Sequence, residues 1–142
     1  RCSQPVELLD IYPTLIDLCG TLSQSGLEGH SLKPQLRYSK AKRPWPAITT
    51  ANQNNHAVVT DKWRFIQYAD GAQELYNVQK DPNEWINVAA DPKSEDVIRD
   101  LKKWLPDVNL PLAPGSAHRI LEQKDGFWYW EGEPVKNEEL DD

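Results

Sequence analysis

The sequence predicts an α+β fold, in which a small four-stranded antiparallel sheet packs on a C-terminal helix, with an N-terminal helix and a C-terminal hairpin in addition. Between residues 47 and 77, short apolar runs alternate with polar residues and are separated by turn signals, as in a meander of strands. Residues 91–105 instead repeat apolar side chains at helical spacing. Because four short strands need a covering element to be stable, we expect this helix to lie on one face of the sheet.

The N-terminal helix is expected over residues 10–20. Asp10 is placed to cap its start, Pro13 falls in the first turn, where its lack of an N–H is harmless, and Gly20 ends it. The apolar side chains form two neighbouring stripes, so this helix needs packing partners on more than one side. We expect the isolated chain to expose an apolar patch here and to self-associate through it, the patch being Ile11, Leu15, Ile16 and Leu18. Residues 21–47 read as an extended surface connector.

The four strands are expected at 47–50, 56–60, 63–68 and 73–77. Two-residue signals separate the later ones, namely Asp61-Lys62 and Asp70-Gly71. In the third strand, alternation places Trp63 and Phe65 on one face and Arg64, Ile66 and Tyr68 on the other.

Three elements are expected after the sheet. Residues 81–84 resemble a capping box on a single helical turn, with Trp85 and Ile86 following as anchors. The helix over 91–105 begins with Asp91 as its cap and ends before Pro106. A final hairpin is expected from residues 118–121 and 127–130.

Composition excludes some classes of partner. The 142 residues carry a formal net charge of −6, which argues against binding to nucleic acid or to an anionic membrane surface. Cys2 and Cys19 have neither Cys-x-x-Cys spacing nor paired histidines that would indicate zinc, so they are either bridged to each other or two idle thiols. The pair Asp141-Asp142 reads as solvating charge in an acidic tail.

Asn55 and His56 are the candidate substrate-binding residues. His56 follows the polar run at 52–55, where a loop could reach into a neighbouring cleft. The structural alternative is a strand-edge histidine bonded to backbone. For His30 and His118 a structural role is favoured, because neither has a partner acid at catalytic spacing.

The aromatic cluster at 128–130 supports a rival function. Together with Trp45 it could form a sugar-stacking platform, which would make the chain a stand-alone carbohydrate-binding module. However, Trp128 and Trp130 fall on one face of a strand and Tyr129 on the other, so we expect the tryptophans to cover a small core. A serine hydrolase site at Ser116 is disfavoured because no nucleophile elbow surrounds any serine.

Four stretches, taken in order, resemble the C-terminal third of sulfatases of the alkaline-phosphatase superfamily: 6–15, 27–32, 74–77 and 81–84. Residues 54–58 and 115–121 are most similar to bacterial iduronate 2-sulfatase-like members. The resemblance implies a large α/β domain followed by a small subdomain. Residues 1–46 would then form a helix and connector at the edge of the missing large domain, and 47–142 the C-terminal subdomain that completes its active-site cleft.

The resemblance also implies where the chemistry lies. Sulfatases use a cysteine matured to formylglycine in a Cys-x-Pro-x-Arg setting, beside calcium. Here the second residue after Cys2 is Gln4 and after Cys19 is Thr21, so neither matches. The chain is expected to hold no catalytic residue and no metal, and to be inactive alone, with formylglycine and calcium supplied by the missing N-terminal domain. Its partners would be that domain and a sulfated carbohydrate, in a periplasmic or extracellular protein.

Overall fold

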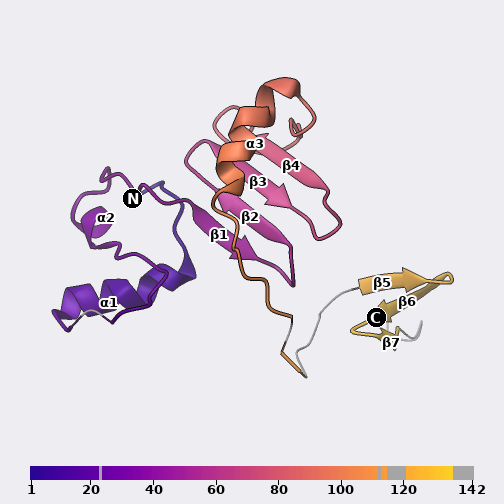
Figure 1. Cartoon of the computed structure of the whole chain (residues 1–142), viewed down its shortest axis with the longest axis horizontal. Helices are drawn as coiled ribbons and strands as arrows, with labels where there is room; N and C mark the ends of the chain where they lie inside the picture. Colours follow the sequence, from indigo (N-terminus) through magenta and orange to yellow (C-terminus); the bar gives the residue numbers. More distant parts are fainter. Residues whose placement is uncertain (23, 112, 115–120, 136–142) are drawn as a thin grey trace. The chain divides into compact units, whose positions relative to one another are not determined.

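The computed structural model describes residues 1–22, 24–111, 113–114 and 121–135. The chain divides into two compact units, Arg1–Asn109 and Leu110–Asp142, which are called the first and second unit below (Figure 1). None of the helices in the described residues is long and apolar enough to cross a membrane.

The sheet of the first unit is the predicted antiparallel meander. It runs in the order β1-β2-β3-β4, and its strands are Ala47–Thr50, His56–Val59, Trp63–Gln67 and Gln73–Asn77. Two strands end one residue earlier than predicted. The register aligns Val58 with Phe65 and Phe65 with Leu75, so these three side chains share one face.

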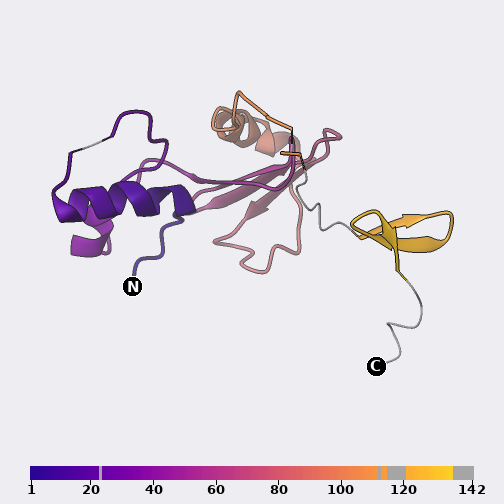
Figure 2. The same cartoon turned by 90° about the horizontal axis from the view of Figure 1, so that it is seen from below.

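Helix α3 (Glu95–Lys102) lies along that face of the sheet (Figures 1 and 2). Ile98 and Leu101 of the helix join the three aligned sheet residues in a single buried cluster, in which Val58, Phe65 and Leu75 have no exposed surface. The α+β prediction, with the sheet packed on this helix, is confirmed.

The helical segment around α3 is shorter than predicted. Asp91 does act as a cap, because its carboxylate accepts a 2.9 Å bond from the Lys93 N–H, but the turn it caps is a 3₁₀ turn, η2 (Pro92–Ser94). At the other end, α3 stops at Lys102, and Trp104 lies beyond it with 41% of its surface exposed. Residues 103–105 form a tighter turn before Pro106, in which the N–H groups of Trp104 and Leu105 bond the carbonyls of Leu101 and Lys102 at 3.1 Å.

Helix α1 (Ile11–Cys19) begins after a 3₁₀ turn, η1 (Leu8–Asp10), and ends at Gly20, whose φ is +68°. Three of the four residues predicted to form an apolar patch, Ile11, Leu15 and Leu18, are each more than half exposed. The fourth, Ile16, is half-buried, so the prediction is wrong for that residue. Ile16 is thus partly covered within the chain, whereas Tyr12 and Cys19, which share its stripe, are exposed.

The connector between α1 and β1 contains a helix that was not predicted. Helix α2 (Lys33–Arg37) has Pro34 in its first turn, where its fixed φ favours a helical start. The Lys33 ammonium lies 2.6 Å from the Asp17 carboxylate of α1. This bond lowers the pKa of Asp17, and Ser31 adds a second hydrogen bond to the same carboxylate. The prediction of an extended connector is therefore wrong at residues 33–37.

The predicted helical turn at 81–84 is wrong as well. Glu84 has a φ of +57° and pairs with Arg64 at 2.8 Å, while the Asp81 carboxylate accepts a 2.8 Å bond from the Ile86 N–H and closes a loop. Trp85 and Ile86, predicted as anchors, are 82% and 66% exposed.

The second unit contains a three-stranded sheet. Its strands are β5 (Leu121–Lys124), β6 (Phe127–Trp130) and β7 (Glu133–Pro134). The two connections, Asp125-Gly126 and Glu131-Gly132, have positive φ at both residues, as two-residue hairpin turns of type I′ require. The predicted hairpin is confirmed with a tighter turn, and β7 was not predicted. His118 and Ser116 lie outside the described residues, as does the acidic pair Asp141-Asp142.

Candidate functional site

The two predicted site residues lie where β1 turns into β2. Residues 51–55 form the connecting loop, and Asn52 and Asn54 adopt φ values of +61° and +63°, which asparagine tolerates better than most residues. A 3.0 Å bond from the Ala51 N–H to the Asn55 carbonyl closes the loop. Asn55 therefore has a defined backbone position at the start of a strand.

The side chain of Asn55 links two loops. Its Nδ2 donates to the Gln53 carbonyl at 3.0 Å, and its Oδ1 accepts from the Ala69 N–H in the β3–β4 turn at 3.2 Å. The residue is half-buried, so part of the amide still reaches the surface.

His56 is buried, with only 5% of its surface exposed. Its Nδ1 lies 2.9 Å from the hydroxyl oxygen of Thr50, its partner across β1, so the bond is to a side chain and not to backbone. Its Nε2 is buried and has no hydrogen-bond partner among the described residues, and the same holds for Oε1 of Gln67, the residue opposite His56 on β3. Two buried polar atoms, His56 Nε2 and Gln67 Oε1, thus lie close to each other in the strand register at this end of the sheet.

Thr50 also lines a hollow of about 420 Å³ in the first unit. His30 and Trp45 form one wall, with ring centroids 3.7 Å apart and planes inclined by 23°. The stacking of His30 on Trp45 is compatible with the predicted structural role, which stays a prediction. Two acidic residues, Glu7 and Glu28, are among its lining residues, and no lysine or arginine is among the described ones. Such a lining suits an uncharged or apolar group and repels a sulfate.

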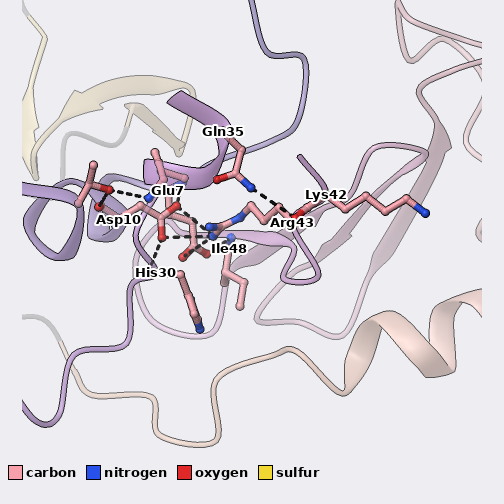
Figure 3. A network of polar contacts seen from close by, with 9 residues as sticks. Glu7, Asp10, His30, Gln35, Lys42, Arg43 and Ile48 are labelled. Atoms are coloured by element: carbon pink, nitrogen blue, oxygen red, sulfur yellow. Dashed lines mark hydrogen bonds and ion pairs between the residues drawn. The ribbon is translucent and has the colours of Figure 1, made fainter. Parts of the chain in front are cut away.

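A buried ion pair holds this wall in place (Figure 3). Asp10 has no exposed surface, and its carboxylate accepts from the N–H groups of Glu7 at 2.9 Å and His30 at 2.8 Å, while Arg43 lies 3.0 Å away. The Arg43 side chain is itself 2% exposed. A further bond, from the Ile48 N–H to the Glu7 carboxylate, ties the assembly to β1.

Sequence reasoning missed this network. Asp10 occupies the predicted position before α1, but its carboxylate makes no bond to the helix and instead joins three segments that are distant along the chain. Arg43 carries no sequence signal, since it stands in a Lys, Arg and Pro-rich stretch that is typical of exposed connectors.

The described residues include no group of three or more His, Cys, Asp or Glu side chains that could hold a metal ion. Cys2 and Cys19 are both free thiols.

Comparison with known proteins identifies the family. The family described as N-sulphoglucosamine sulphohydrolase, C-terminal, matches residues 2–110. The chain belongs to this family. A sulfatase of Formosa agariphila is 45% identical over 109 residues, which make up 77% of this chain and 22% of that protein. Arylsulfatase K of Danio rerio is 37% identical over 139 residues, covering 89% of this chain and 26% of that protein.

A solved structure of a 2-O GAG sulfatase is similar over 66% of this chain and 22% of its own length, with a TM-score of 0.54 and 28% identity. The family membership confirms the coarser part of the predicted resemblance, that of a sulfatase C-terminal region. The chain spans about a quarter of the length of these relatives.

Proposed function

We propose that this chain is the C-terminal part of a sulfatase that hydrolyses sulfate esters of sulfated glycans. The observation that carries the proposal is the family match over residues 2–110. We propose further that the enzyme is iduronate 2-sulfatase-like and removes a 2-O-sulfate from a uronic acid of a glycosaminoglycan. The 28% identity to a 2-O GAG sulfatase supports this finer assignment.

The reactive groups are proposed to lie in the preceding part of the polypeptide. Hydrolysis of a sulfate ester needs an activated oxygen nucleophile and positive charge beside the sulfate. The described residues do not fit a calcium site, because they hold no group of three or more candidate metal ligands and the buried carboxylate of Asp10 is already paired with Arg43. We therefore place formylglycine and calcium in that preceding part and derive no step through them.

The exposed side of α1 is proposed as the surface that the preceding part covers. Ile11, Leu15 and Leu18 present apolar surface in a row, and Leu8 of η1 is 86% exposed beside them. Burying this row would stabilise the whole protein by about 25 cal/mol per Å² of apolar surface removed from water. In this arrangement residues 1–46 belong to the edge of the large domain, and 47–142 form the subdomain.

The β1–β2 loop is proposed to line the active-site cleft of the intact enzyme, with Asn55 and His56 in contact with the glycan. Two properties support this role. The Asn55 amide is fixed by one bond within its own loop and one to the β3–β4 turn, and the His56 Nε2 lacks a partner within the described residues. Asn55 can meet a sugar without rearrangement, whereas the buried His56 ring requires the loop at 51–55 to shift outward.

Kinetics of the whole enzyme test this proposal. We expect His56→Ala and Asn55→Ala to lower turnover of a 2-O-sulfated uronate disaccharide at least tenfold more than turnover of a small aryl sulfate, because only the disaccharide reaches a remote sugar contact. Thr49→Ala, an exposed neighbour on β1, is the matched control and should change neither rate.

Each part of the proposal has its own contrary result. Equal losses on both substrates, or none, would refute the contact residues. Hydrolysis of 6-O-sulfated or N-sulfated glucosamine, with none of the uronate, would refute the 2-O assignment. If the whole protein hydrolysed no sulfate ester, the assignment of the enzyme as a sulfatase would be refuted.

A further inference from the structure

The second unit exposes an apolar face. The β5–β6 register pairs Leu121 with Trp130 and Gln123 with Trp128, so Leu121, Trp128 and Trp130 lie on the same side of the sheet. They are 54%, 47% and 47% exposed, respectively. The prediction that the two tryptophans cover a small core is therefore wrong among the described residues, and this aromatic face needs another explanation.

The sheet is small, and no helix among the described residues of the second unit covers its apolar face. Its strands are four, four and two residues long, and the described residues supply no helix on either face. A small sheet with an exposed apolar face gains stability when that face is packed against another surface. A sugar ring is too small to provide that support, so the occupant should be a protein surface.

Charge selects among protein surfaces. Residues 110–142 contain eight acidic and three basic side chains, and thus carry five of the six net negative charges of the chain. A second copy of this unit would bring the same charge and be repelled, and a sulfated glycan would be repelled for the same reason. A basic surface around an apolar patch is complementary.

The comparisons indicate where such a surface lies. The family match ends at residue 110, but the alignment with arylsulfatase K of Danio rerio takes in 89% of the chain and so extends into the second unit. That relative is about four times as long as the aligned part. The second unit thus accompanies a much larger preceding body, and a body that handles sulfate esters must carry cations.

We infer that the face formed by Leu121, Trp128 and Trp130 docks on a basic, apolar-centred surface of the polypeptide that precedes residue 1. This inference rests on the proposed function, which supplies the larger basic body. The docked sheet acts as a clasp that holds the end of the chain on the catalytic part. Apolar contact supplies the adhesion, and the net negative charge of residues 110–142 selects the surface.

Hydrogen exchange in the whole protein tests the clasp without reference to activity. We expect the β5–β6 amides to be protected, and Trp128→Ala with Trp130→Ala to speed their exchange at least tenfold. Phe127→Ala, on the opposite face, and Trp85→Ala, an exposed tryptophan of the first unit, should leave it unchanged. Reversing one charge with Glu133→Lys should also speed exchange, without removing any apolar surface.

The contrary results are distinct. Equal exchange in the native protein and in the double variant would overturn the clasp. Protection that rises with protein concentration, together with a dimer in sedimentation, would assign the face to a second copy. Protection that appears only when a sulfated disaccharide is added would assign it to glycan. Failure of the sulfatase assay, with protection intact, would overturn the proposed function and leave the docking in place.

Discussion

Replacing Arg43 with methionine should loosen the region that holds the hollow. Arg43 is the cation at 3.0 Å from Asp10, and the two side chains are 2% and 0% exposed. Removing one member of a buried ion pair leaves an uncompensated charge and costs about 3–5 kcal/mol. Since about 1.4 kcal/mol is a factor of ten, the region should open a hundredfold to several thousandfold more often.

Hydrogen exchange at the amides of His30 and Ile48 measures this opening, because their N–H groups bond the Asp10 and Glu7 carboxylates. Arg99→Met is the matched control. Arg99 pairs with Asp96 at 2.6 Å, but with side chains 67% and 80% exposed, so its loss should cost less than about 1 kcal/mol. The amide of Phe65, in the core of the sheet, should be unaffected by either variant.

A double variant, Arg43→Met with Asp10→Leu, separates charge from hydrogen bonding. It removes both buried charges, but it leaves the N–H groups of Glu7 and His30 without acceptors, at about 1–3 kcal/mol each. We expect a loss smaller than the sum of the two single losses. If Arg43→Met and Arg99→Met changed the exchange of His30 equally, the ion pair would not support the hollow.

Two further predictions concern single side chains. Gly29→Ala would place a Cβ 2.0 Å from the backbone oxygen of Leu9, and should lower the free energy of unfolding by about 3 kcal/mol, against about 1 kcal/mol for Gly26→Ala, where nothing lies within 4 Å and only the φ of +84° is unfavourable. Denaturant unfolding compares them, and equal losses would contradict the close approach. Glu74→Gln should lower the pKa of Tyr76 towards 10.0, because the phenol donates a 2.9 Å bond to the Glu74 carboxylate that raises this pKa. That bond stabilises the fold below pH 10, and its contribution is lost as the pH rises through the raised pKa of Tyr76. An NMR titration of the tyrosine ring measures this pKa, and an equal pKa in the native protein and in Glu74→Gln would refute the prediction.

Local signals were enough to predict the sheet and its helix. Each strand is short and alternates apolar with polar residues, and turn residues separate the later strands. The core residues Phe65 and Ile98 each belong to a series of apolar residues with the period of a strand or of a helix, respectively. The type I′ turn at Glu131-Gly132 carried a comparable signal, an acidic residue followed by glycine, and could have predicted β7.

The errors arose where contacts between distant residues decide the outcome. Glu84 leaves helical geometry to reach Arg64, 20 residues earlier, and Asp10 turns from its helix to bond His30 and Arg43. The residues next to Glu84 and Asp10 in the sequence do not indicate these distant contacts. The candidate site shows the same limit, because a polar run identifies the loop at 51–55 but does not reveal that the His56 ring is buried.

The burial of His56 allows its functional role to be separated from a structural one. An unpaired buried polar atom costs about 1–3 kcal/mol, and Gln67, directly across the ladder, has a buried oxygen with the same deficit. If the two atoms satisfy each other after a small rotation, Gln67→Ala should impair the enzyme as much as His56→Ala does, on every substrate alike. If the glycan supplies the partner for Nε2, only His56→Ala should lower turnover of the disaccharide more than turnover of the aryl sulfate. Measuring both variants on both substrates therefore decides whether this end of the sheet supports the fold or binds the sugar.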